Sequence, residues 1–239
     1  LINNIEFFYD LSKALKGTKF VIEAINENLE EKIKIFKEIS LKINKEIVIA
    51  SSSSFIPISQ INVKTLNKER CLNLHPGNPP YLLRFAEVVP SKDTSKKAIN
   101  KTISILNSIK LKPIILKKEI DGFVFNRLQG ALLREAYSLV DENIVNASDI
   151  DSIITKGLGL RWAVVGPFET IDLNTKGGIE KHNERMIPFY RKMFAGKKTN
   201  FTKNSIKKVI TERRKSLPLE QLDEKITWRD KKLFKLINL

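Results

Sequence analysis

The chain is poor in the features that mark several common classes of protein. It has one cysteine, Cys71, among 239 residues, so no disulfide can form within it. Because structural disulfides belong to oxidising compartments, we expect a reducing one, most simply the cytoplasm. No apolar run approaches the roughly 20 residues that a membrane helix needs, since Lys, Asn or Glu interrupts every stretch. We therefore expect no membrane segment.

Nucleotide-binding and metal-binding motifs are absent as well. No Gly-x-Gly-x-x-Gly occurs, because the nearest start, at Gly157 and Gly159, has Trp162 in place of the third glycine. There is no P-loop, no His-Glu-x-x-His and no Cys-x-x-Cys, so no metal site is expected. Only two histidines are present, His75 and His182, and histidine is the side chain that titrates near neutrality without help.

The charge is strongly positive, with 42 Lys+Arg against 27 Asp+Glu and a formal net charge of +15. Residues 196–239 hold 13 Lys or Arg and 5 Asp or Glu, so +8 of this excess lies in the last fifth of the chain. Aromatic residues are few in this basic tail, and no zinc-ligand spacing accompanies them. We therefore expect no specific nucleic-acid binding, although the tail could serve as an interaction surface.

Hydrophobic patterning predicts strands that alternate with helices as far as residue 119. The expected strands are 19–25, 47–50, 71–75, 84–89 and 113–116, and the expected helices are 29–43 and 94–109. Asn28, with Glu31 three positions later, is a helix N-cap signal. This alternation predicts an α/β domain with a mainly parallel sheet.

The pattern changes near residue 120. Apolar residues at helical spacing predict a helix over 123–140, and Ser148 opens another that Gly157 can stop. No convincing strand follows. We therefore expect two domains, an α/β domain over 1–119 and an all-helical domain over 120–239.

His75 is the first candidate for chemistry. It lies at the end of a predicted buried strand, directly before Pro-Gly-Asn-Pro-Pro, and open α/β sheets bind their ligands at this edge. The alternative is a core histidine satisfied by a backbone carbonyl, and the spacing does not decide between them. His182 lies in a run of polar residues and is expected to be a solvated helix residue.

Three further groups could join His75. Glu87 lies twelve positions after it, so a strand–turn–strand unit could pair the two side chains; the alternative is an exposed strand-end glutamate. The serines at 51–54 form either a polar loop or a set of hydroxyls at a strand's carboxyl end. Asn126 lies among apolar residues of a predicted helix and needs hydrogen-bond partners if it is buried.

Several strings, in order and spacing, resemble the 3-hydroxyacyl-CoA dehydrogenase family. They occupy residues 23–32, 50–54, 75–81, 87–89 and 122–128. Residues 157–170 and the Trp-Arg-Asp at 228–230 are most similar to the lambda-crystallin branch, which includes L-gulonate 3-dehydrogenase. The resemblance extends from about Leu11 to the C-terminus.

The resemblance implies an NAD-dependent oxidation of a 3-hydroxy acid or 3-hydroxyacyl-CoA to the 3-keto product. His75 matches the family's general base, and Glu87 matches its carboxylate partner. Ser54 and Asn126 match residues that hydrogen-bond the reacting oxygen. Three positions match contacts to the dinucleotide: Ala24, Glu27 and Lys32.

The family pattern also begins with a glycine-rich βαβ unit that this sequence does not contain. We expect the 239 residues to be the C-terminal part of a longer chain, with a partial Rossmann-like sheet that binds NAD poorly alone. The resemblance implies a homodimer formed through the helical domain, and a substrate that is an acyl-CoA, L-gulonate or carnitine. The alternative is a truncated, non-catalytic fragment that acts as an interaction module through the basic tail 196–239.

Overall fold

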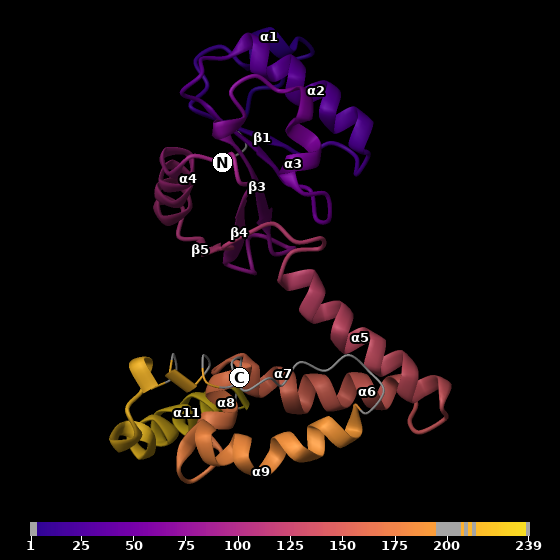
Figure 1. The fold of residues 1–239 in the computed structure, drawn as a ribbon, viewed down its shortest axis with the longest axis vertical. Coiled ribbons are helices and arrows are strands. Elements are labelled where there is room, and N and C mark those ends of the chain that lie inside the picture. The colour runs from indigo at the N-terminus through magenta and orange to yellow at the C-terminus, as the bar shows by residue number, and fades with distance from the viewer. Residues whose placement is uncertain (1–3, 195–206, 208–209, 212–213, 238–239) are drawn as a thin grey trace. The chain divides into compact units, whose positions relative to one another are not determined.

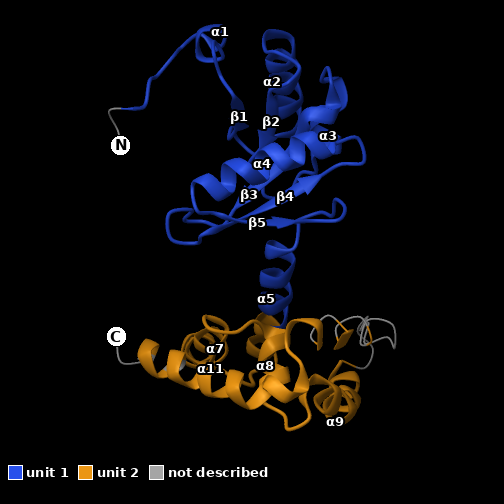
Figure 2. Ribbon diagram, turned by 90° about the vertical axis from the view of Figure 1, so that its left-hand side faces the viewer, with its two compact units in different colours: residues 1–135 blue, residues 136–239 orange. Residues whose placement is uncertain are grey.

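The computed structural model describes residues 4–194, 207, 210–211 and 214–237. It contains two compact units, residues 1–135 and 136–239, which are described separately (Figure 2). The division lies within a helix that begins at Phe125, so the first unit includes the start of the sequence expected to be helical.

The first unit is built on a five-stranded sheet with the strand order β1-β2-β3-β4-β5. The strands are β1 (Phe20–Glu23), β2 (Val48–Ser51), β3 (Cys71–Pro76), β4 (Phe85–Pro90) and β5 (Lys112–Ile115). Three of the four pairings are parallel, and β3 with β4 is antiparallel. All five predicted strands and the mainly parallel sheet are therefore confirmed.

Helices cover both faces of this sheet (Figure 1). They are α1 (Leu11–Ala14), α2 (Leu29–Lys42), α3 (Ile58–Ile61) and α4 (Lys96–Ser108), and α5 (Phe125–Asp141) begins after the sheet. On one face, Ala98 and Leu106 of α4 pack with Leu72 and Val88 of the sheet. On the other, Phe36 of α2 belongs to a second buried cluster with residues of α3, β2 and β3.

Helix α2 begins where its sequence predicts. The Asn28 side-chain oxygen accepts a hydrogen bond from the Glu31 backbone N–H at 3.1 Å, which satisfies one of the unpaired donors of the first turn. The fixed start of the helix brings Lys32, one turn later, to a buried position beneath the carboxyl end of β1.

In the second unit, the described residues form helices and no strands. The helices are α6 (Ala147–Ile153), a π-helical turn (Ile154–Leu158), α7 (Gly159–Trp162), α8 (Pro167–Leu173), α9 (Gly178–Met193) and α11 (Leu222–Ile237). The prediction that Gly157 stops a helix is wrong. The chain stays helical through Gly157 by widening into the π-helical turn and then continues as α7.

His182 also differs from its prediction. It lies within α9 and is 8% exposed, not solvated, and its Nδ1 lies 3.4 Å from the Thr175 hydroxyl. Desolvation, followed by the charge of Arg185, lowers the pKa of His182 below its ordinary value.

The basic tail predicted at 196–239 lies partly outside the described residues, which leave out 195–206, 208–209, 212–213 and 238–239. Its described C-terminal portion is helical in α11, where Leu222 packs with Val165 and Leu173. Among the helices that the structure describes, none is both long and apolar enough to cross a membrane.

Candidate active site

The antiparallel pairing of β3 with β4 places His75 directly opposite Glu87. The His75 Nδ1 lies 2.8 Å from Glu87 Oε2, and the two side chains are 8% and 2% exposed. The strand–turn–strand arrangement expected from the sequence is therefore present. The alternative of an exposed strand-end glutamate is wrong.

The second oxygen of the Glu87 carboxylate is also engaged. Oε1 accepts hydrogen bonds from the backbone N–H groups of Val124, at 2.9 Å, and Phe125, at 3.1 Å. Burial by itself raises the pKa of Glu87, but the hydrogen bonds from His75 and from these two amides outweigh it and hold the pKa below its usual value. Glu87 is therefore ionised near neutral pH, with both oxygens fixed.

Aromatic rings enclose the imidazole of His75. The Phe123 ring lies 5.5 Å from it and the Phe125 ring 6.3 Å, measured between ring centroids. The anionic Glu87 can only accept a hydrogen bond, so Nδ1 of the His75 imidazole is the donor in this contact. In the neutral imidazole the proton therefore lies on Nδ1, and Nε2 is an acceptor. Nε2 makes no hydrogen bond to any residue in the part of the chain that the structure describes. It is thus available to an incoming group.

Asn126 and Ser54 are joined directly. The Asn126 Nδ2 donates to the Ser54 backbone oxygen at 2.9 Å. Asn126 follows Phe125 in the chain, so the residues that fix Glu87 also hold the loop at the end of β2. The structure therefore pairs the four predicted residues two by two, His75 with Glu87 through their side chains and Asn126 with the backbone oxygen of Ser54.

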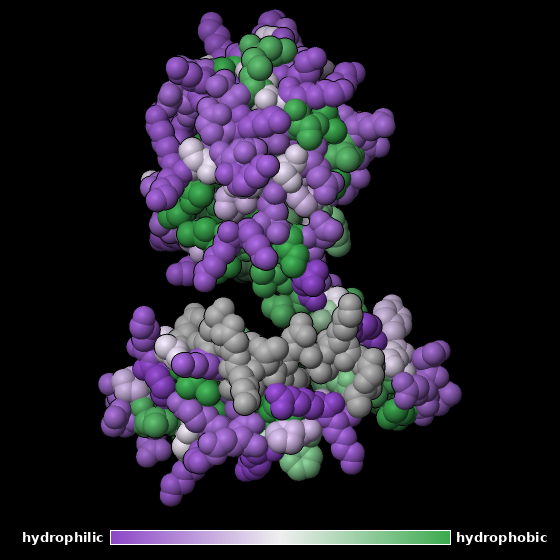
Figure 3. Space-filling view, in the orientation of Figure 1, coloured by the Kyte–Doolittle hydropathy of each residue, from purple (hydrophilic) through white to green (hydrophobic). Residues whose placement is uncertain are grey.

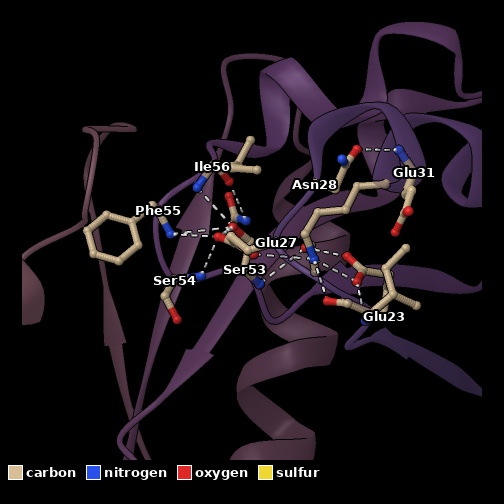
Figure 4. A network of polar contacts seen from close by, with 12 residues as sticks. Glu23, Glu27, Asn28, Glu31, Ser53, Ser54, Phe55 and Ile56 are labelled. Atoms are coloured by element: carbon tan, nitrogen blue, oxygen red, sulfur yellow. Dashed lines mark hydrogen bonds and ion pairs between the residues drawn. The ribbon is translucent and has the colours of Figure 1, made fainter.

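Glu27 organises the loop that carries Ser54 (Figure 4). One of its carboxylate oxygens accepts from the Ser53 hydroxyl and from the backbone N–H groups of Ser54 and Phe55, the latter two at 3.1 Å. Burial raises the pKa of Glu27, but these hydrogen bonds and Lys32 together lower it below its ordinary value. The side chain remains 40% exposed, so it still presents a carboxylate to solvent.

The Lys32 side chain, in contrast, is buried and binds other groups of the protein. It is 1% exposed, and its ammonium donates to Glu23 Oε1 at 2.8 Å and to the Ile25 oxygen at 3.2 Å. The ammonium also forms an ion pair with Glu27 Oε2 at 3.4 Å. A direct contact between Lys32 and a dinucleotide would require this buried ammonium to become accessible.

Ser51 and Ser53 of this network belong to the serine run predicted at 51–54, whereas Glu23 was not predicted as a site residue. Glu23 accepts from the Ser51 hydroxyl at 2.6 Å as well as from Lys32, and the Ser53 hydroxyl bonds to Glu27. All three side chains are buried. The signal was the carboxylate at the end of an apolar strand, which must find partners if that strand is buried.

The carboxyl ends of β1 and β2 carry residues that could hold part of a dinucleotide. Ala24 is exposed directly after β1 and carries no side chain large enough to block a planar ring, and the exposed Glu27 carboxylate can accept from ribose hydroxyls. Among the described residues, no group of three or more His, Cys, Asp or Glu could hold a metal ion.

A mainly parallel sheet with a buried imidazole–carboxylate pair at its carboxyl edge defines an α/β enzyme domain of the nucleotide-binding type. Two family models match nearly the whole chain. Residues 1–120 match the NAD binding domain of 3-hydroxyacyl-CoA dehydrogenase, and residues 122–215 match its C-terminal domain. The chain belongs to the 3-hydroxyacyl-CoA dehydrogenase family, whose members are NAD-dependent oxidoreductases.

Individual relatives agree with this assignment. The chain is 35% identical to the lambda-crystallin of Oryctolagus cuniculus over 235 residues, which cover 96% of this chain and 73% of the relative. It is 32% identical to the L-carnitine dehydrogenase of Oceanobacillus iheyensis, over 99% of this chain and 78% of that one. Among solved structures it is similar to 5-formyl-3-hydroxy-2-methylpyridine 4-carboxylic acid 5-dehydrogenase, an NAD+-dependent dismutase, with a TM-score of 0.70 and 27% identity over 90% of this chain and 76% of that one.

Proposed function

We propose that this protein oxidises a 3-hydroxy acid or 3-hydroxyacyl-CoA to the 3-keto product, with His75 as the general base. The observation that supports this most is the His75–Glu87 pair, in which Glu87 holds Nδ1 and leaves Nε2 open. A base must lie within hydrogen-bond reach of the proton that it removes and must keep one tautomer, and this pair meets the second condition before substrate binds.

The chain's own residues divide the work. His75 Nε2 takes the proton of the 3-hydroxyl, and the buried, ionised Glu87 stabilises the imidazolium that forms. We assign to Ser54 and Asn126 the positioning of the reacting oxygen, since their contact joins the loop after β2 to the residue that follows Phe125, whose ring contacts His75. The aromatic rings of Phe123 and Phe125 exclude water from the imidazole.

NAD, when bound, accepts the hydride that leaves C3 of the substrate. We assign Ala24 and Glu27 to the binding of its nicotinamide end. Lys32 forms an ion pair with Glu27, and we assign to it the positioning of that carboxylate. Glu27 thus has two roles, since the same carboxylate fixes the Ser54 loop.

The test of the base is the His75→Ala variant of the intact enzyme. We expect kcat to fall by about 10²–10⁴-fold, the usual contribution of a general base, with NAD affinity nearly unchanged. His182→Ala is a matched control because that histidine lies in the second unit. An equal loss of NAD binding in His75→Ala, or full kcat without the imidazole, would overturn the assignment.

The substrate class is a separate question. The branch resemblance favours a short hydroxy acid such as L-gulonate or carnitine over an acyl-CoA, in agreement with the similarity to lambda-crystallin and L-carnitine dehydrogenase. We therefore expect kcat/KM to be higher for one of the two short substrates than for 3-hydroxybutyryl-CoA. The reverse order would assign the enzyme to acyl-CoA chemistry and leave the role of His75 intact.

We also propose a homodimer that forms through α5, and we place the start of the helical domain at residue 120. Helix α5 spans 17 residues, yet none of them is buried in the chain that the structure describes. Its exposed large apolar residues are Leu128, Leu132, Leu133, Tyr137 and Val140. Apolar residues also come to the surface around the start of α5 in Figure 3. Exposed apolar faces of this kind are typical of protein–protein interfaces, and we propose that the second copy of the chain packs against this one.

The Leu132→Glu and Leu133→Glu variants should therefore shift the protein from dimer to monomer in light scattering. Arg134→Glu, on the same helix, is the control for charge. A wild-type protein that is monomeric at micromolar concentration would overturn this part of the proposal.

A further inference from the structure

A cationic hollow lies entirely within the second unit. Its volume is about 360 Å³. Its lining includes the apolar residues Gly157 and Leu160, and its polar lining residues are Lys156, Arg161, Asn174, Arg229 and Asp230. The π-helical turn, α7, the end of α8 and α11 therefore all contribute to one wall.

Arg229 is held rigidly at this wall. Its Nη1 donates to the Asn174 side-chain oxygen at 2.7 Å, and its Nε donates to Asp230 Oδ1 at 2.9 Å. Its side chain is only 13% exposed. A guanidinium fixed in this way presents its charge without the entropy cost of ordering a free side chain.

The other two cations have no such partners. Lys156 and Arg161 form no ion pair or side-chain hydrogen bond with any residue that the structure describes. Asp230 is the one carboxylate in the lining, against three cationic side chains. The hollow therefore carries a net charge of about +2 from these four side chains, which draws a counter-anion.

The backbone at the hollow is unusual as well. Lys156 and Gly157 belong to the π-helical turn Ile154–Leu158, and single π-helical turns inside α-helices are frequent at functional sites. Gly159 is required there, because a Cβ at this position would lie 2.8 Å from the Ile154 backbone oxygen. Gly157, in contrast, has open space around its missing Cβ, so the wall of the hollow is bare at that point.

We propose that this hollow binds an anionic group of a small molecule, a phosphate or a carboxylate. Arg161 and Lys156 would contact its oxygens, while Arg229, already oriented by Asn174 and Asp230, would add its field. The proposal does not depend on the dehydrogenase activity. The same chemistry has two sources, a free anion or the anionic end of the enzyme's own substrate.

The test is the binding of inorganic phosphate to the full chain by calorimetry at constant ionic strength. Gly157→Glu places a carboxylate in the hollow, and Gly157→Gln places a neutral side chain of the same size there. We expect Gly157→Glu and Arg161→Gln to weaken phosphate binding by at least about tenfold, and Gly157→Gln to weaken it much less. Lys181→Gln, an exposed lysine of α9, is the control for net charge and should match the wild type.

Competition then separates the two sources. Displacement of phosphate by 3-hydroxybutyrate or 3-hydroxybutyryl-CoA would assign the hollow to the substrate's anionic end, and binding that neither displaces would assign it to a free anion. Equal phosphate affinity in the wild type, Gly157→Glu and Arg161→Gln would overturn the proposal. So would equal losses in Gly157→Glu and Gly157→Gln, because charge would then not decide binding.

Discussion

At the scale of single residues, Lys32 and Glu23 form a buried ion pair in the first unit. Both side chains are 1% exposed. Removing one partner of such a pair leaves a buried charge without compensation. The pair therefore ties the folding of the sheet edge to the geometry of the loop that Glu27 holds.

We expect Lys32→Met to lower the free energy of unfolding by about 3–5 kcal/mol, because it leaves the Glu23 carboxylate unpaired. Lys32→Met combined with Glu23→Gln should recover part of this loss, and urea unfolding of the single and double variants measures it. Lys34→Met, a neighbour on the same helix, serves as the control. A double variant no more stable than Lys32→Met would contradict the pairing.

Cys71 gives a second prediction at this scale. The residue is 0% exposed, and desolvation raises the pKa of its thiol to about 12. Because the thiolate is the reactive form, iodoacetamide at pH 8 should leave the folded protein unmodified and label it only after unfolding in urea. Mass spectrometry of the intact chain measures this, and labelling at the same rate in both states would disprove the burial.

At the scale of the element, α2 shows what local sequence determines. The N-cap of α2, formed by Asn28 and Glu31, was predictable because it depends on residues a few positions apart. The presence of β1 and β2 before and after this helix was predictable from their own short apolar runs. The burial of His182 was not predictable, because it depends on packing that its polar sequence neighbours conceal. Gly157 misled for a similar reason, since a π-helical turn lets the helix continue through a residue that usually ends one.

The same helix supplies a test of how strongly its start is fixed. Asn28→Ala removes the acceptor for the Glu31 amide and should lower the free energy of unfolding by about 1 kcal/mol. Asn28→Asp keeps the acceptor and should cost little. Thermal unfolding followed by circular dichroism separates these outcomes, and equal effects of the two substitutions would show that the cap is not stabilising.

At the scale of the molecule, two carboxylates of the candidate active site couple folding to pH. The pKa of Glu87 is lower in the folded chain than its ordinary value of 4.5. The stability that ionised Glu87 contributes is therefore complete above about pH 4.5 and is lost as the pH falls below it. Glu27, whose pKa is also lowered, adds to the same loss.

Glu87→Gln should accordingly flatten the acid side of the stability–pH curve while leaving the fold intact at neutral pH. Urea unfolding at a series of pH values between about 3 and 7 measures the slope. His182→Ala tests a different part of the same curve. The pKa of His182 is lowered below its ordinary value of 6.5, so the stability that the neutral side chain contributes is lost as the pH falls below about 6.5. An acid slope unchanged in Glu87→Gln would mean that other groups account for it.

The antiparallel pairing of β3 with β4 has a consequence for how this sequence can vary. His75 and Glu87 face each other because their strands pair in one register, with the loop between Pro76 and Phe85 closing the hairpin. Side chains alternate between the faces of a strand, so one residue inserted within either strand would turn one partner of the pair to the opposite face. Insertions in the intervening loop leave the pairing untouched. Length variation among active homologues should therefore be confined to this loop and absent from the two strands.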